Sequence, residues 1–225
     1  MSHQITYEEV AMVKSKEWNW SEVTDNTWNE PSEDAYYYVN RWKEKGFKIF
    51  LDLGCGLGRH SILFAKNGYE TYSLDLSQYG LDVLEKKGKE LGLSIETNFG
   101  DISNLPYESN YFDCLFSYHV ISHTDTVGIK IVVNEINRVL KNGGEFFVTI
   151  CSKNSPNFTS KTYPKIDENT ILKTEGPEVD VPHFYSDLEG VKEIFQEFDV
   201  IRIRHIEDFF MDKSSWHYFI HGKKR

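Results

Sequence analysis

Short apolar runs alternate along most of this chain with longer segments whose apolar residues recur at helical spacing. The short runs predict seven strands, near residues 47–53, 69–76, 94–102, 111–117, 145–151, 200–207 and 216–222. The longer segments predict helices over residues 58–67, 77–91, 125–140 and 191–198. Because strands that alternate with helices usually pair in parallel, we expect a parallel sheet covered by helices on both faces.

Capping residues set the expected ends of these helices. Asn67-Gly68 is a typical carboxyl-terminal stop for the first helix, and Ser77 can cap the second. Either Asp125 or Thr126 can cap the third. The apolar stripe of the third helix indicates that one of its faces packs against the core.

A glycine-rich turn follows the first strand and opens the first helix. The turn reads Asp52-x-Gly54-x-Gly56-x-Gly58, followed by Arg59. Glycine allows positive φ and close approach of a ligand to the backbone, and the first N–H groups of a helix point at that ligand. A dinucleotide fingerprint requires glycine where Arg59 stands, and a P-loop requires Gly-Lys-Ser/Thr. Both of these ligand classes are therefore disfavoured.

Three acids stand at the ends of the first three predicted strands. Asp52 precedes the first glycine, where a carboxylate repels a pyrophosphate and attracts an ammonium or sulfonium group. Asp75 can accept hydrogen bonds from both ribose hydroxyls, with Leu76 against the base. Asp101 can accept a hydrogen bond from the exocyclic amine of adenine. Together these acids predict a ligand that is a nucleoside with a positively charged tail.

From about residue 49 to residue 150 the chain resembles the class I S-adenosylmethionine-dependent methyltransferases, in particular those that act on small molecules. The motifs that carry this resemblance recur in order and lie at residues 51–60, 75–77, 100–102, 105–107, 111–117 and 135–144. Asn142 stands where the family usually has proline, which affects a turn and not the ligand chemistry. The resemblance implies a Rossmann-like, doubly wound α/β sheet of seven mostly parallel strands, in which the last two strands are antiparallel.

The resemblance also implies S-adenosylmethionine as cofactor and a set of residues around it. Asp52, Gly54 and Gly56 would hold the methionine moiety. Asp75 would hold the ribose, and Asp101 with the Ile102 backbone would hold the adenine. The full set of cofactor-binding residues that we expect is Asp52, Gly54, Cys55, Gly56, Gly58, Arg59, Asp75, Leu76, Asp101, Ile102, Ser117 and Tyr118.

Composition disfavours several classes of function. The 225 residues carry a net charge of −10, which disfavours a nucleic-acid partner because such partners select basic surfaces. No signal peptide or membrane-spanning run is evident, so a cytoplasmic protein is expected. Three widely spaced cysteines indicate neither a disulfide framework nor a thiolate zinc site. No spacing of His, Cys and Glu supports a metal site, and none is expected.

Two segments lie outside the expected core and are where acceptor choice should reside. Residues 1–45 form an aromatic-rich, helical cap, which precedes a cofactor-binding domain over residues 46–225. The aromatics of this cap either pack over an open edge of the sheet or form a lid over the cofactor and acceptor. In a lid, Trp28 and Tyr38 are expected to exclude water and place the acceptor. Residues 152–185 form a long polar insertion in which residues 170–174 can make a small hairpin.

Two histidines are candidate general bases. His119 and His123 follow the fourth strand, beside the ligand crevice of a doubly wound sheet. Histidine can take a proton near neutral pH as the methyl group reaches an acceptor. His183, Tyr185 and His217 are weaker candidates, and His60 is expected to pack locally.

The sequence therefore predicts transfer of a methyl group to a small-molecule acceptor by in-line displacement. The sulfonium already activates the methyl group, so positioning and the exclusion of water can supply most of the rate enhancement. A non-catalytic S-adenosylmethionine-binding protein and a nucleic-acid methyltransferase are the alternatives. The acceptor, its accepting atom and the oligomeric state are left open by the sequence.

Overall fold

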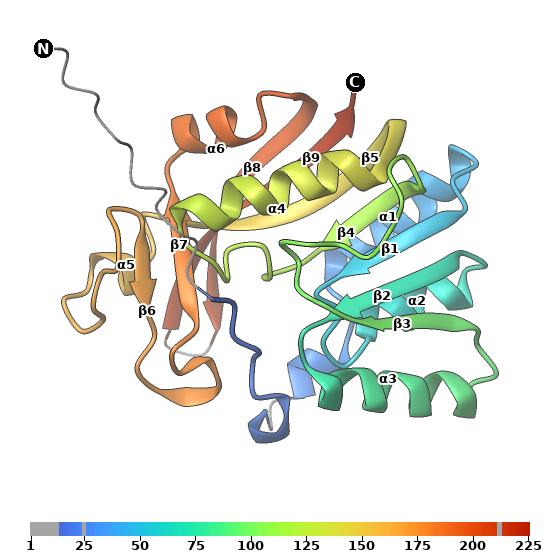
Figure 1. Cartoon of the computed structure of the whole chain (residues 1–225), viewed down its shortest axis with the longest axis horizontal. Coiled ribbons are helices and arrows are strands. Elements are labelled where there is room, and N and C mark those ends of the chain that lie inside the picture. The colour runs from blue at the N-terminus through green and yellow to red at the C-terminus, as the bar shows by residue number, and fades with distance from the viewer. Residues whose placement is uncertain (1–13, 24–25, 211–212) are drawn as a thin grey trace, which may run out of the picture.

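The computed structural model describes residues 14–23, 26–210 and 213–225, and its centre is one twisted sheet (Figure 1). Five parallel strands lie in the order β3-β2-β1-β4-β5. Their bounds are β1 Ile49–Leu53, β2 Glu70–Asp75, β3 Ile95–Phe99, β4 Phe112–Ser117 and β5 Leu140–Ser152. β9 (Lys213–Lys224) runs antiparallel to β5 and pairs on its other side with β8 (Phe198–Phe210).

Helices cover both faces of this sheet. α1 (Glu33–Glu44) and α2 (Arg59–Lys66) pack on one face, where they meet Phe50 and Phe116. α4 (Thr126–Val139) and α6 (Leu188–Ile194) pack on the other, where they meet Leu51 and Leu115. Neighbouring residues of each strand thus point to opposite faces, and both sets are buried, as expected for central parallel strands.

The structure confirms the Rossmann-like α/β fold with an antiparallel carboxyl-terminal pair. The cap of α3 (Gln78–Glu90) is Ser77, whose Oγ accepts from the Gly80 N–H at 3.5 Å. The cap of α4 is Asp125 and not Thr126, because Oδ1 of Asp125 accepts from the N–H groups of Val127 and Gly128. α6 begins three residues before its predicted start, after the Asp187 cap.

The described part of the chain has nine strands, two more than predicted, because the insertion contributes β6 (Thr170–Leu172) and β7 (Pro182–Ser186). These two strands form an antiparallel hairpin, and β7 runs parallel to the end of β5. Cys151 of β5 pairs with β7 on one side and with β9 on the other. β4 and β7 therefore pair with the same edge of β5, one after the other. β7 extends the sheet beyond the end of β4.

The remaining elements are short. α5 (Pro156–Thr159) and the 3₁₀ turn η3 (Gly176–Glu178) belong to the insertion, and η1 (Trp20–Glu22) and η2 (Asn26–Asn29) precede α1. Residues 1–13 of the predicted cap lie outside the described residues, and the division of the chain at residues 45 and 46 stays a prediction. Among the described residues, no helix has the length and apolar character needed to cross a membrane.

A buried carboxylate attaches α1 to the sheet. Glu145 of β5 is fully buried and accepts two hydrogen bonds of 2.9 Å from the Arg41 guanidinium. The Trp42 indole N–H donates to it at 2.9 Å, Lys45 Nζ lies 3.0 Å away, and His221 Nε2 contacts it at 3.0 Å. Burial alone would raise the pKa of Glu145, but hydrogen bonds from His221, Arg41 and Lys45 hold it well below its ordinary value.

We expect Glu145→Gln to lower the free energy of unfolding at pH 7 by about 3 to 5 kcal/mol, since it leaves the cations around the site without their anion. Chemical denaturation with urea would measure the loss. Glu44→Gln, which changes an exposed acid of α1, is the control and should have little effect. Equal stability of the two variants would show that Glu145 does not hold α1.

The same carboxylate should make stability depend on pH. A carboxyl group whose pKa is lowered on folding contributes its full stabilisation above the ordinary pKa of about 4.3, and this contribution is lost as the pH falls further. Unfolding measured between pH 7 and pH 3 should therefore show a steeper acid decline for the wild-type chain than for Glu145→Gln.

Candidate active site

The glycine-rich turn is built by backbone hydrogen bonds between β1 and β2. The N–H groups of Gly54 and Cys55 both donate to the Leu74 carbonyl, at 2.8 and 3.0 Å. Gly54 has φ +74° and Gly56 has φ +53°, values that L side chains rarely adopt. A Cβ atom at Gly54 would also lie 2.2 Å from Val120, so this turn needs glycine for both conformation and space.

The two acids at the ends of β2 and β3 help to shape the same turn and the loop beside it. Asp75 accepts from the Gly56 N–H at 2.7 Å through Oδ2 and from the Ser77 N–H at 2.8 Å through Oδ1. Burial raises the pKa of Asp75, while these backbone donors oppose the rise. Oδ1 of Asp101 accepts from both the N–H and the Oγ of Ser103, each at 2.8 Å.

A cavity lies where the glycine turn, the ends of β2 and β4 and the amino-terminal segment meet. Most of the predicted cofactor residues line it. They are Gly54, Cys55, Arg59, Asp75, Leu76, Asp101, Ile102 and Tyr118. The predicted bases His119 and His123 line it as well. The structure thus brings ten of the predicted site residues to one cavity.

Four predicted cofactor residues do not line the cavity: Asp52, Gly56, Gly58 and Ser117. Oδ2 of Asp52 accepts from the N–H and the Oγ of Ser61 in α2, at 2.9 and 2.6 Å, and burial raises the pKa of Asp52 to about 7. Ser117 Oγ donates to the Leu53 carbonyl at 2.7 Å. Both side chains thus join β1 to its neighbours, and their contacts with a cofactor stay predictions.

Three tryptophans of the amino-terminal segment also line the cavity. The sequence named Trp28 and Tyr38 for a place at the acceptor, and of these two only Trp28 lines the cavity. Trp18, Trp20 and Trp28 pack edge to face, with ring centroids 4.4 to 5.9 Å apart. The Arg59 guanidinium lies 4.9 Å from the Trp28 ring and 5.6 Å from the Tyr118 ring. In contrast, Tyr38 and Trp42 of α1 belong to the core. Part of the aromatic cap therefore packs in the core, and the role of the tryptophans as a lid over cofactor and acceptor stays a prediction.

The amino-terminal segment also touches the insertion. The Asn19 N–H donates to the Pro177 carbonyl at 3.2 Å, and Lys16 Nζ lies 3.0 Å from Asp180. Figure 1 shows this dark blue segment crossing between the β6–β7 hairpin and α3. The two variable segments of the sequence thus meet beside the cavity, which Lys16 also lines.

His119 has the most unusual backbone of the site. Its φ is +59°, which is uncommon for a residue other than glycine. Its N–H donates to Thr149 Oγ1 at 2.7 Å, and the same oxygen lies 3.3 Å from Nδ1. Burial lowers the pKa of His119 well below its ordinary value, so the ring is neutral at pH 7.

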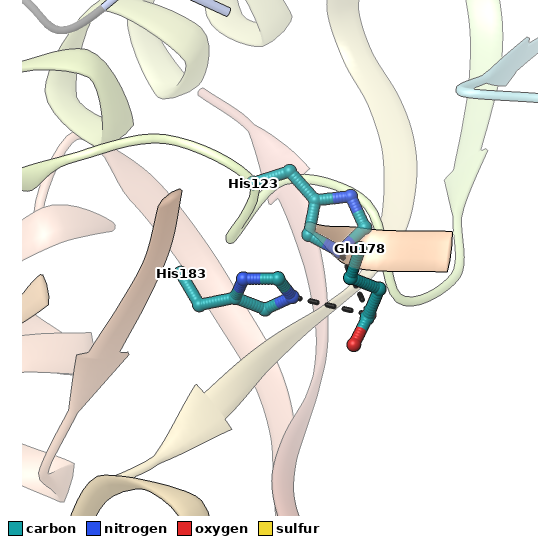
Figure 2. Close-up of side chains that lie close together, drawn as sticks. All are labelled: His123, Glu178 and His183. Carbon is teal, nitrogen blue, oxygen red and sulfur yellow. Dashed lines mark hydrogen bonds and ion pairs between the residues drawn. The ribbon is translucent and has the colours of Figure 1, made fainter. Parts of the chain in front are cut away.

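The other candidates differ in their surroundings. Nε2 of His60 accepts from the Ser32 N–H at 3.1 Å, which fits the local role expected for it. Tyr185 is buried in β7, and the ring of His217 lies 4.1 Å from that of His119. His183 and His123 meet Glu178 (Figure 2), a residue that sequence reasoning did not single out.

Known proteins resemble the region that forms this site. Residues 51–148 match a family model described as a methyltransferase domain. The sarcosine/dimethylglycine N-methyltransferase of Aphanothece halophytica is 34% identical over 134 residues, which cover 55% of this chain and 47% of that protein. The demethylmenaquinone methyltransferase of Lactobacillus johnsonii is 34% identical over 122 residues, which cover 47% of this chain and 48% of that protein.

A solved structure extends the likeness to almost the whole fold. A SAM-dependent methyltransferase from Methanosarcina mazei superposes with a TM-score of 0.70 at 17% identity, over 87% of this chain and 98% of the other. The chain spans about half the length of the curated relatives it matches. S-adenosylmethionine is the methyl donor typical of this family. The chain therefore contains a class I S-adenosylmethionine-dependent methyltransferase domain.

Proposed function

We propose that this chain binds S-adenosylmethionine in the cavity and transfers its methyl group to a small-molecule acceptor. The observation that carries the proposal is the convergence of Asp75, Asp101 and the glycine turn on one cavity. Each carboxylate retains acceptor capacity beside the backbone bonds it already makes, because an ionised carboxylate offers about four lone-pair sites. Asp75 can thus accept from ribose hydroxyls, and Asp101 can accept from the adenine amine.

The chain's own residues supply binding, orientation and a dry site. When bound, the cofactor supplies a methyl group that its sulfonium already activates. Leu76 and Ile102 flank the adenine, and the Trp18–Trp20–Trp28 cluster excludes water from the acceptor side. His119 is better placed than His123 to contact an acceptor, because His123 faces Glu178. Positioning carries the rate in this proposal, and a base is needed only for an acceptor that arrives protonated.

The alternatives predict different outcomes and are supported less well. A nucleic-acid methyltransferase requires affinity for a phosphate backbone, and the net charge of −10 opposes that. Ser117-Tyr118-His119-Val120 also replaces the Asn/Asp-Pro-Pro-Tyr/Phe loop of nucleic-acid amino methyltransferases. A non-catalytic binding protein would keep the cofactor cavity without transferring the methyl group.

The proposal is tested by incubating the chain with a metabolite extract and S-adenosylmethionine that carries an isotopically labelled methyl group. We expect label to appear in a low-mass product identified by mass spectrometry. Label in added RNA or DNA would move the assignment to a nucleic-acid methyltransferase. Micromolar cofactor binding by calorimetry without any label transfer would instead indicate a binding protein.

Asp75→Ala should weaken cofactor binding by at least about tenfold, because it removes hydrogen bonds from a ribose to a charged acceptor, each worth about 1.5 to 3 kcal/mol. Calorimetry with S-adenosylhomocysteine would measure this. Asp82→Ala changes an exposed acid on α3 and should leave affinity unchanged. Thermal unfolding of both variants would detect any collapse of the turn, and unchanged affinity in a folded Asp75→Ala chain would place the ribose elsewhere.

Substitutions at His119 and Trp28 separate positioning from base catalysis. His119→Asn tolerates the positive φ and should keep turnover within about tenfold of wild type, since the donor is already activated. Trp28→Ala should lower turnover by up to about 100-fold, because misplaced acceptors react slowly. Initial rates at saturating cofactor would decide, with Tyr79→Ala on the exposed face of α3 as control. A loss of about three orders of magnitude in His119→Asn alone would identify His119 as a general base.

A further inference from the structure

Three side chains from separate segments converge beside the cavity (Figure 2). His123 comes from the loop between β4 and α4, Glu178 ends η3, and His183 lies in β7. Nε2 of His183 lies 3.1 Å from Oε1 of Glu178, and Nε2 of His123 lies 4.0 Å from the same oxygen. The three potential ligand atoms all lie within 4.8 Å of one another.

We propose that His123, Glu178 and His183 bind one divalent transition-metal ion, with Zn²⁺ as the fitting probe. Two imidazole nitrogens and one carboxylate oxygen form a donor set that Zn²⁺ and related ions take, and three protein ligands leave a position open for a small molecule. Nothing in the established family membership assigns such a site.

Tautomer geometry at His183 calls for a cation at this point. Nδ1 of His183 lies 2.9 Å from the Val181 carbonyl, which can only accept, so Nδ1 carries the proton. In the neutral ring, Nε2 then turns a lone pair toward the Glu178 carboxylate. Two acceptors 3.1 Å apart repel each other unless a proton or a metal ion lies between them.

The position of His123 favours a metal ion over a proton. Its Nε2 is 4.0 Å from the same Glu178 oxygen, too far for a hydrogen bond. Ligands about 2.1 Å from one tetrahedral ion stand about 3.4 Å apart. The 3.1 Å separation between His183 and Glu178 is close to this value, and His123 has to move toward Glu178 to complete the site. The His123 side chain is 22% exposed, so its ring is free to turn toward Glu178 when an ion binds.

Surrounding contacts orient the three ligands. The Val181 carbonyl fixes the ring of His183, and Lys173 Nζ lies 3.1 Å from Oε2 of Glu178. Lys173 therefore occupies one carboxylate oxygen and leaves Oε1 directed at the two histidines. Histidine and carboxylate ligands of protein-bound metals are usually held by such outer contacts.

The location of the site gives the acceptor a chemical class, and this step rests on the proposed function. His123 is a member of the cluster and also lines the cavity. The open position on the ion therefore adjoins the space proposed for the acceptor. An acceptor that carries a metal-binding oxygen, nitrogen or sulfur could reach the ion while its accepting atom faces the methyl group. The metal site itself does not depend on methyl transfer.

The proposal is tested by calorimetric titration of Zn²⁺ into the full chain after treatment with a chelator. We expect saturable binding of one ion per chain, weakened at least about tenfold in Glu178→Gln and in His123→Ala. Glu175→Gln, in an exposed acid of the same loop, and His205→Ala, in a histidine bonded to Ser152, are matched controls and should bind as wild type. Absence of saturable binding, or equal affinity in Glu178→Gln, would overturn the proposal.

A second measurement needs no variant and therefore does not depend on how a substituted chain folds. X-ray absorption of the zinc-loaded wild-type chain should show nitrogen and oxygen ligands with imidazole scattering, and its absence would also overturn the site. Zinc binding without any methyl transfer would count against the proposed function alone. Methyl transfer by a chain that binds no zinc would count against the metal site alone.

Discussion

The buried carboxylate of Glu145 is the interaction on which the arrangement around the cavity depends. Arg41, Trp42 and Lys45 of α1 all converge on it, and His221 of β9 meets it from the sheet. A buried carboxylate needs hydrogen-bond donors and opposite charges around it, because no water solvates it. These contacts therefore fix the position of α1 on the sheet. Asp34 forms an ion pair with Arg204 of β8, and Ser32 meets His60 of α2. The tryptophan cluster precedes this anchored helix and is thereby directed over the glycine turn.

The half of the site that is proposed for the cofactor lies at the ends of strands. Backbone geometry positions the glycine turn and the acids there. Parallel strands bring their carboxyl ends to one edge, and the turn after β1 is tied to Leu74 of β2 through the backbone. Asp75 holds the Gly56 N–H with one oxygen and still faces the cavity. Under the proposed function, Asp75 both shapes the turn and recognises the ribose, so this part of the site can be inferred from a short stretch of sequence.

The sequence predicted the parallel sheet, the glycine turn and most of the cavity wall because each follows from a local pattern. These patterns are the spacing of apolar residues, the capping residues of helices and the acids at strand ends. It did not predict β7 as a strand of the main sheet, because that depends on an edge of β5 left free beyond β4. It also did not predict that one oxygen of the Asp52 carboxylate accepts from Ser61 of α2, and the expected contact of Asp52 with a ligand stays a prediction. The meeting of His123 with Glu178 and His183 spans some 60 positions, and no spacing rule could indicate it.

The attachment of β7 has an evolutionary consequence. Within the sheet, β7 pairs with β5 only through Cys151 and Ser152, and Ser122 supplies further contacts from the loop after β4. The segment between β5 and α6 is therefore a module that joins the sheet without interrupting β1, β2 or the glycine turn. Under the proposed function, divergence or exchange of that module would change which molecules are accepted while the nucleoside half of the protein is inherited intact.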